Sequence, residues 1–344
     1  MIYVVSLTWS AQPLERLQGS MGGALDRRMT RITYEELFLR RRGPIGHYIF
    51  TDLDRLTRYE LDELGAFARA MERVEPAARI LNDPARIVIE RTSLLRRLHE
   101  AGINDFTASR LPDGERPPRY PVFIRAADAH LGPETGLIPD ERAFEQAIAD
   151  MDARGVPLAG RIAVGATLER SPDGFFRKYG VFTIGGRIIP QHVMRGDSWI
   201  VKSRWHQPSD DAAEEELRFV RENPHHDLMM RVCRIAGVDF GRIDYGIVGG
   251  RPQVYEINTN PKFPRFEKSD ARSERRALIR RAIIEALREI DRPLGRRGFV
   301  TFERPRPVVH PPGFPVSIAG LPLLRHAMVF LWNRMLDKRA GHDR

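Results

Sequence analysis

The sequence predicts an α+β protein in which a small α/β domain precedes a larger region of strand pairs and helices. Two observations support this expectation. A strand, an amphipathic helix and a second strand follow one another within residues 1–85, which is the order of an α/β unit. Further on, residues 178–194 and 242–258 each read as two apolar strands joined by a glycine-containing turn, which is typical of an antiparallel hairpin.

The N-terminal elements are read in chain order. "MIYVVSL" predicts a buried strand, "GHYIFTDLD" a second strand, and "RILNDP" a short strand that Pro84 ends. Between the last two lies a predicted helix whose apolar face is formed by Leu61, Leu64, Phe67 and Met71. No glycine-rich phosphate-binding loop follows the first strand, so we do not expect a nucleotide to bind in this part of the chain.

From Ile87 onward the sequence predicts a second group of helices and strands. "IVIERTSLLRRLHEAGI" predicts a helix with leucines at 94, 95 and 98 and a stop at Gly102. "PVFIRA" and "RIAVGATLE" predict strands. Further helices are expected over 140–155, 211–224, 225–237 and 270–290. Residues 291–344 read as a tail that is rich in proline and arginine and then apolar.

The charge of the chain favours anionic partners. Its 344 residues carry a formal net charge of +9 and a sequence pI of about 10.0. Such a balance suits nucleotide phosphates, nucleic acid or an acidic membrane surface, and it does not choose among them. Dispersed arginine runs such as "RRALIRR" are equally well explained as solvated helix faces.

The cysteine content and the apolar segments limit the cellular compartments in which we expect the protein. A single cysteine, Cys233, excludes an internal disulfide and a zinc cluster, which indicates a reducing, cytoplasmic setting. Its apolar helical surroundings favour a buried thiol over a nucleophile. No signal peptide is visible at the start. The apolar stretch 314–332 is broken by Pro322, Arg325 and His326, so we expect no membrane span there, while peripheral membrane contact stays open.

The second hairpin carries the chemistry. With a period of two, Arg242 and Asp244 share one face of the first strand, and Glu256 and Asn258 share one face of the second. A three-residue turn at 249–251 with a glycine bulge would pair Asp244 with Glu256 and gather the four polar residues on one side. Ile243, Tyr245, Tyr255 and Ile257 would then line the opposite, apolar side. A two-residue turn would scatter the polar set over both faces, because a slip of one residue turns every side chain to the other face.

The polar cluster predicts a metal site. Carboxylate and amide oxygens are hard donors that suit one or two Mg²⁺ ions, which also hold substrate phosphates. Arg242 is placed to neutralise a developing oxyanion or a phosphate. An ordinary surface face with salt bridges is the alternative. It is disfavoured because the flanking residues are apolar, because Asn258 adds nothing to a salt bridge, and because Pro261 ends the strand directly after the cluster.

These residues resemble a known family. "RID", a short glycine-containing turn and "VYEINTNP" are similar to the metal-binding end of the ATP-grasp superfamily, as in D-alanine–D-alanine ligases, glutathione synthetases and RimK-like ligases. The resemblance implies two α+β subdomains that clasp ATP over residues 86–290, after a pre-ATP-grasp domain over 1–85 and before the tail 291–344. It also implies that Asp244, Glu256 and Asn258 hold Mg²⁺, or Mn²⁺ in its place, against the ATP phosphates, and that Arg242 is catalytic.

The resemblance assigns ATP contacts with some departures from the family pattern. Arg91 and Arg125 stand where many members have lysine, which keeps the charge and allows bidentate contacts. Glu169 is the nearest acid for a ribose contact, and Lys178 either reaches the nucleotide or lies on the surface. The loop over the phosphates is "DAHLGPETG" rather than a serine-rich glycine loop.

Other basic residues have two readings each. Arg195, Lys202 and Arg204 either border the acceptor site or form a basic loop. His192 is expected to be a packed strand histidine rather than a base. His225 and His226 begin a helix and, being adjacent, do not share a face for a metal.

The function expected from this pattern is an ATP-dependent carboxylate–amine ligase that acts through an acyl-phosphate. Its partners would be small-molecule or peptide carboxylates and amines, nucleic acid would not be required, and a homodimer is compatible with the resemblance. Two alternatives stay open. One is phosphoryl transfer without ligation, and the other is an inactive basic protein that binds nucleic acid or a membrane surface, for which steeply salt-dependent binding would speak.

Overall fold

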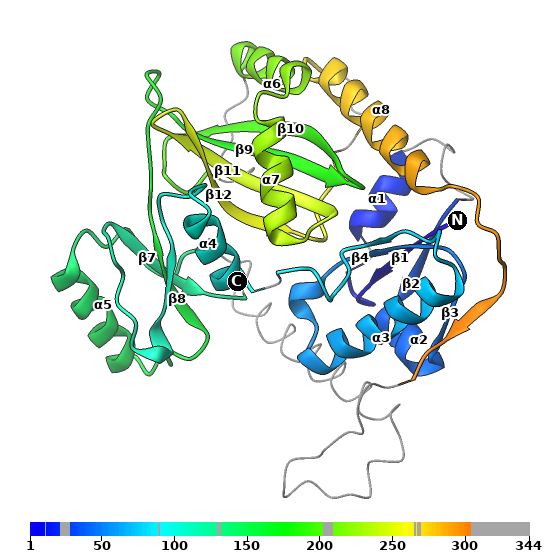
Figure 1. Ribbon diagram of the computed structural model, residues 1–344. Coiled ribbons are helices and arrows are strands. Elements are labelled where there is room, and N and C mark those ends of the chain that lie inside the picture. Colours follow the sequence, from blue (N-terminus) through cyan, green and yellow to red (C-terminus); the bar gives the residue numbers. More distant parts are fainter. Residues whose placement is uncertain are drawn as a thin grey trace, which may run out of the picture.

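The computed structural model of the chain describes residues 1–10, 12–20, 28–88, 90–128, 132–201, 209–264, 266 and 270–303. Its architecture is α+β, as the sequence predicts, with one parallel sheet near the N-terminus and antiparallel sheets after it. Figure 1 shows the parallel sheet at lower right, a large antiparallel sheet above it, and a smaller sheet with one helix at lower left. Residues 304–344 of the predicted tail 291–344, with its apolar stretch 314–332, lie outside the described residues.

The N-terminal sheet has the strand order β2-β1-β4-β5 and is parallel throughout. Its strands are β1 (Ile2–Ser6), β2 (Met29–Thr33), β4 (His47–Phe50) and β5 (Ile80–Leu81). The helices between them are α1 (Gln12–Ser20), α2 (Tyr34–Arg40) and α3 (Arg58–Val74). Thr57 begins α3 with a capping box to Glu60, and the expected apolar face of α3 is buried at Leu64, Phe67 and Met71. The sequence did not indicate α1, β2 and α2.

One side of the parallel sheet is covered from far along the chain. Helix α8 (Ser273–Ile290) buries Ile279, Ile283 and Leu287 in the same core as Ile2 and Ile49. After α8, strand β13 (Phe299–Thr301) pairs antiparallel with β3 (Arg42–Pro44). The orange segment in Figure 1 follows this return of the chain past the parallel sheet. The first 85 residues therefore depend on α8 for part of their core.

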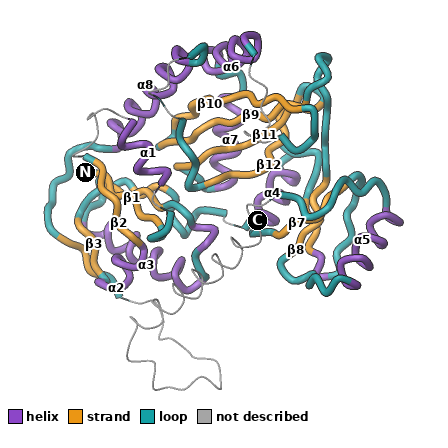
Figure 2. The backbone as a smooth tube through the Cα atoms, turned by 180° about the vertical axis from the view of Figure 1, so that it is seen from behind, coloured by secondary structure: helices purple, strands orange, loops and turns teal. Residues whose placement is uncertain are grey.

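The smaller body is a three-stranded antiparallel sheet in the order β6-β8-β7. Its strands are β6 (Ala108–Arg110), β7 (Val122–Ala126) and β8 (Arg161–Gly165). Helix α5 (Glu141–Ala153) packs on it through Phe144 and Met151. Helix α4 (Arg91–Glu100) packs its Leu95 against the other side of this sheet and its Leu94 and Leu98 against the large sheet. Both views place α4 between the bodies (Figures 1 and 2).

The large sheet is antiparallel in the order β10-β9-β11-β12. Its strands are β9 (Phe176–Ile184), β10 (Arg187–Gly196), β11 (Phe240–Val248) and β12 (Arg251–Asn258). Helices α6 (Asp210–Glu222) and α7 (His226–Ala236) contact the sheet through Phe219, Met229 and Val232, which share a core with Ile243 and Tyr245. Both predicted hairpins are present, and on the opposite face of the sheet Phe182, Ile184 and Phe240 share a core with α8.

Candidate nucleotide and metal site

The β11–β12 hairpin brings the two predicted metal-binding carboxylates together. Asp244 and Glu256 are cross-strand partners, and Arg242 pairs with Asn258. The expected three-residue turn is wrong, because Val248 pairs with Arg251 and leaves a two-residue turn at Gly249 and Gly250. Both glycines have positive φ, 56° and 74°, as the two-residue hairpin turn requires.

A β-bulge restores the register that the shorter turn would have shifted. The pairing slips between Asp244 and Tyr245, so Tyr255 is an extra residue on β12. The bulge also corrects the expected placement of Tyr255, because its hydroxyl lies where a side chain on Gly246 would begin, and its ring packs near Phe106 rather than in the core beneath the sheet. Val254 takes the core position in its place.

Asp244 lies in a double cationic clamp. Arg242 donates from Nε to Oδ1 at 2.6 Å and from Nη2 to Oδ2 at 3.1 Å, and Lys178 Nζ contacts Oδ2 at 3.1 Å. The carboxyl is 1% exposed. Burial alone would raise its pKa, but Arg242 and Lys178 outweigh burial and hold the pKa of Asp244 well below its usual range. Lys178 is therefore a member of the site and not a surface lysine.

Glu256 meets a second group of cations. Arg91 Nη2 contacts Glu256 Oε2 at 3.0 Å, while Arg91 Nη1 donates to the carbonyl of Ala127 at 2.8 Å. Arg125, on β7, is close enough that burial and the charge of Arg91 lower its pKa to about 10. Helix α4 and strand β7 thus deliver two guanidinium groups to the carboxylate of β12.

A cavity of about 840 Å³ lies between the large sheet and the β7–β8 sheet. It gathers six of the eight residues that the sequence singled out: Arg91, Arg125, Glu169, Lys178, Arg242 and Glu256. Apolar and aromatic side chains form much of the remaining wall, including Phe123, Met194, Trp199 and Tyr255. Phe123 and Trp199 have ring centroids 5.2 Å apart. A cavity lined by both cations and aromatic rings suits an anionic ligand that carries a flat ring.

Glu169 has a further contact, and the two remaining sequence-selected residues, Asp244 and Asn258, do not line this cavity. Glu169 accepts a hydrogen bond from the backbone N–H of Gly249, so it also holds the hairpin turn. Asp244 is buried under its two cations. Asn258 accepts from the N–H of Asn260 at 2.8 Å and lines a second cavity of about 920 Å³. Arg91 and Glu256 line both cavities, so their ion pair stands between the two.

Strand β10 contributes Gln191 and His192 to the cavity. From the sequence, only His192 was considered, and it was expected to be a packed strand histidine. The β9–β10 pairing shifts between Pro190 and His192, and this bulge turns both Gln191 and His192 to the cavity. The His192 ring lies against Gly180, where a side chain would collide with it. Among the described residues, His192 Nε2 has no hydrogen-bond partner. Burial and the charge of Arg242 lower the pKa of His192 well below its usual value, so its ring is neutral.

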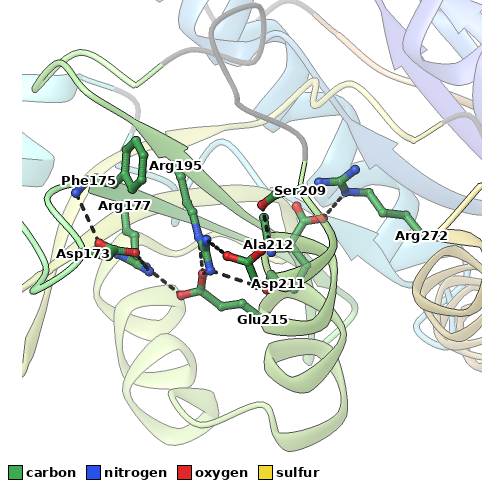
Figure 3. A network of polar contacts seen from close by, with 10 residues as sticks. Asp173, Phe175, Arg177, Arg195, Ser209, Asp211, Ala212, Glu215 and Arg272 are labelled. Carbon is green, nitrogen blue, oxygen red and sulfur yellow. Dashed lines mark hydrogen bonds and ion pairs between the residues drawn. The ribbon is translucent and has the colours of Figure 1, made fainter.

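Arg195 belongs to a separate ion-pair network, shown in Figure 3. Arg177 and Arg195 are cross-strand partners on β9 and β10, and Glu215 of α6 contacts both. Asp173 adds contacts to Arg177, and Asp211 adds one to Arg195. Arg177 lines the cavity of about 840 Å³, which we call the nucleotide-sized cavity, while Arg195 does not. Lys202 and Arg204 lie outside the described residues.

The other predicted side chains have structural partners. His225 precedes α7 and shares a hydrogen bond of 2.8 Å with the Tyr245 hydroxyl. Cys233 is buried in α7, as expected, and burial raises the pKa of its thiol to about 11. A thiol with such a pKa is a poor nucleophile at neutral pH.

The donor set fits a hard divalent cation. Two carboxylates and one amide lie on neighbouring strands, and oxygen ligands of this kind are the ones Mg²⁺ prefers. Within the described part of the chain no three His, Cys, Asp or Glu side chains gather as a metal group. A metal here would accordingly depend on Asp244, Glu256 and Asn258 together with oxygens of a bound ligand, since Mg²⁺ usually keeps several non-protein ligands.

Comparisons with known proteins find likeness in structure alone. No protein-family model and no curated protein matches the chain. A solved D-alanine–D-alanine ligase from Bacillus anthracis is similar at 11% identity and a TM-score of 0.49, covering 84% of this chain and 96% of that one. A RimK domain ATP-grasp protein from Sphaerobacter thermophilus has 14% identity and a TM-score of 0.45, covering 83% and 98%. D-cycloserine synthetase has 16% identity and a TM-score of 0.45, covering 83% and 99%.

These identities of 11–16% and TM-scores below 0.5 carry no argument about function, so the chemistry has to be argued from the side chains. A search of the described helices for one long and apolar enough to cross a membrane finds no candidate.

Proposed function

We propose that the protein is an ATP-dependent carboxylate–amine ligase that works through an acyl-phosphate. One observation carries the proposal. Four cationic side chains, Arg91, Arg125, Lys178 and Arg242, converge with Glu256 on one cavity beside the buried carboxylate of Asp244. Such a concentration of fixed positive charge suits a polyphosphate whose terminal group is transferred.

The roles of the side chains follow from their positions. Arg91 and Arg125 come from elements on one side of the cavity and can bind phosphate oxygens in a bidentate manner. Lys178, which lies on β9 of the large sheet, offers a point charge. The aromatic wall around Phe123 and Trp199 would hold the base of the nucleotide. Arg242, fixed in its rotamer by Asp244, would stabilise the charge that develops on the acyl carbon's oxygen.

A divalent ion is part of the proposal. Asp244, Glu256 and Asn258 would hold Mg²⁺, or Mn²⁺ in its place, and the bound ion would neutralise charge on the phosphates. Lys178 and Arg91 now neutralise those carboxylates. With a cation bound, both side chains would become available to the phosphates, so the charge of the site would stay balanced with and without its ligand.

The reaction that we propose needs no nucleophile from the protein. A substrate carboxylate would attack the terminal phosphorus, ADP would leave, and an amine would displace phosphate from the resulting acyl-phosphate. The protein positions the reactants and balances charge. Consistent with this, the one cysteine is buried with a raised pKa and takes no part. The setting we infer is the cytoplasm, with small-molecule or peptide substrates.

An ADP-release screen over pairs of carboxylates and amines tests the proposal. Wild type should release ADP only when both substrates are present, and Glu256→Gln should lose at least a hundredfold in rate. Glu72→Gln, which changes an exposed glutamate on α3, should keep the wild-type rate. ADP release that needs only one substrate would indicate phosphoryl transfer without ligation. Failure of every pair, together with no rise in Tm on adding ATP and Mg²⁺, would sink the proposal.

A further inference from the structure

The second cavity, of about 920 Å³, lies between helices α3 and α4, on the far side of the Arg91–Glu256 ion pair. Its volume is in the range of small-ligand sites. Apolar side chains from α3, α4 and the segment between them form part of its wall, among them Leu61, Ile87, Val88 and Leu94. The Arg91–Glu256 ion pair would lie between a molecule in this cavity and the nucleotide-sized cavity.

The α3 wall has a shape that depends on a glycine. Arg58, Asp62, Gly65 and Arg69 follow one another at helical spacing and all line the cavity. Gly65 is buried within the helix, where glycine costs about 1 kcal/mol relative to alanine. A methyl group on Gly65 would lie 3.2 Å from Arg69 Nη1, so the guanidinium of Arg69 lies across the space that the glycine leaves.

Most charges along the wall are already matched. Arg58 contacts Asp62 at 3.4 Å, and Arg86 contacts Asp239 at 3.2 Å. Glu90 is bound by Arg110 at 2.6 Å. Three wall residues differ: within the described ranges the side chains of Arg69, Arg97 and Asp128 form no ion pair or hydrogen bond, although all three are exposed and reach the cavity.

The three unmatched charges are arranged with a direction. Asp128 follows β7 directly after Ala127, whose carbonyl accepts from Arg91, so the carboxylate lies beside the boundary with the nucleotide-sized cavity. Arg97 lies six residues beyond Arg91 on α4, about 9 Å along the helix axis. Arg69 lies on the facing helix α3. Asp128 is therefore next to the Arg91–Glu256 boundary, while Arg97 and Arg69 come from the two helices, α4 and α3, on either side of the cavity.

We propose that this second cavity binds the amine substrate and that this substrate carries carboxylates, as an acidic amino acid or acidic dipeptide does. Its amino group would lie at Asp128, facing the site of acyl transfer, and its carboxylates would pair with Arg69 and Arg97. Guanidinium groups bind carboxylates through two parallel hydrogen bonds, which gives these pairs geometric selectivity. The identification of the ligand as the amine substrate rests on the proposed ligase function, whereas the binding itself does not.

Calorimetric titration with the dipeptide L-Glu-L-Glu, without nucleotide and at physiological salt, tests the cavity directly. Wild type should bind it, and should bind the neutral dipeptide L-Gln-L-Gln at least tenfold more weakly. Arg69→Ala and Arg97→Ala should each raise the Kd at least tenfold. Arg73→Ala is the matched control, because Arg73 is an exposed arginine one turn further along α3 that does not line the cavity.

A second comparison examines the direction of the ligand. Asp128→Asn should weaken binding of L-Glu-L-Glu, but should leave binding of its N-acetyl derivative unchanged, because that molecule lacks the ammonium group. The inference is overturned if wild type does not bind the dipeptide at millimolar concentration, or if Arg73→Ala weakens binding as much as Arg69→Ala. Binding that depends on Arg69 and Arg97 in a protein that never releases ADP would keep the site and refute the ligase function; the reverse result would refute the site alone.

Discussion

Asp244 and Glu256 face each other across β11 and β12, although the turn that joins these strands is one residue shorter than their register requires. The extra residue, Tyr255, makes up the difference as a bulge three residues before the end of β12. The bulge keeps both carboxylates on one face of the sheet and turns the ring of Tyr255 onto the same face. The metal-type donor set therefore depends on a local irregularity and not on the turn alone.

The bulge predicts a sensitive glycine. Gly246→Ala would place a methyl group where the Tyr255 hydroxyl lies, so Tyr255 and its bulge must move. We expect a loss of about 1–3 kcal/mol in the free energy of unfolding, which is the usual cost of overpacking, and weaker binding of ATP with Mg²⁺. Urea denaturation and the Tm shift caused by ATP–Mg²⁺ measure the two effects. Gly19→Ala, at an exposed site on α1 with nothing within 4 Å, should weaken neither. Equal behaviour of the two variants would contradict this role of the bulge.

The clamp on Asp244 predicts a pH-dependent stability difference. Asp244→Asn leaves Arg242 and Lys178 without their shared counter-charge, so we expect a loss of about 3 kcal/mol at pH 7. Since the folded pKa lies below the unfolded value of about 3.9, this contribution is present above pH 4 and is lost as the pH falls further. Urea denaturation of both proteins from pH 7 to pH 3 should show the gap narrowing.

A matched variant separates this effect from general charge removal. Asp62→Asn breaks a pair in which Arg58 is 89% exposed, so its cost should be no more than about 0.5 kcal/mol. If both aspartate variants cost the same at pH 7, the clamp does not stabilise the site.

The sequence was a good guide to the register of the site and a poor one to how the register is reached. Alternating apolar and polar residues fix which side chains of β11 and β12 share a face, so the pairing of Asp244 with Glu256 could be predicted and is confirmed. Whether a three-residue turn or a two-residue turn with a distant bulge provides that register depends on packing around Tyr255 and Gly246. Such packing involves Phe106, which is far away in sequence.

The N-terminal region shows a similar limit. Strands β1 and β4 and helix α3 have clear apolar patterns and are present where expected. Helices α1 and α2 lie in a basic segment with little periodicity, and the parallel sheet takes part of its cover from α8, more than 200 residues later. Local patterns cannot show burial that a distant helix provides. Likewise, Gln191 was not recognised because a bulge turns it toward the cavity.

The Arg177–Arg195 pair predicts two carboxylates of unequal importance. Glu215 is 16% exposed and contacts both arginines, whereas Asp211 is 77% exposed and contacts one of them. Glu215→Gln should therefore cost about 2–3 kcal/mol, because two neighbouring guanidinium groups lose their common anion. Asp211→Asn should cost less than about 0.5 kcal/mol. Chemical denaturation at pH 7 and low salt compares them; a larger loss for Asp211→Asn would show that the network of Figure 3 is not organised around Glu215.

His47 predicts a loss of stability in mild acid. Its Nδ1 accepts from the N–H of Arg79 at 3.0 Å, so its proton lies on Nε2, which donates to the carbonyl of Arg292 at 2.9 Å. Burial lowers the pKa of His47, and the Arg292 carbonyl offsets this only in part. Because the folded pKa is lower than the unfolded value of about 6.5, the contribution of His47 is complete above pH 6.5 and is lost as the pH falls, by up to about 1.4 kcal/mol per pH unit.

Urea denaturation between pH 7 and pH 5 measures how the free energy of unfolding depends on pH, and the slope should be shallower for His47→Gln than for wild type. His226→Gln changes a half-exposed histidine at the start of α7 and should keep the wild-type slope. If His47→Gln and wild type lose stability in parallel, protonation of His47 is not what weakens the fold in acid.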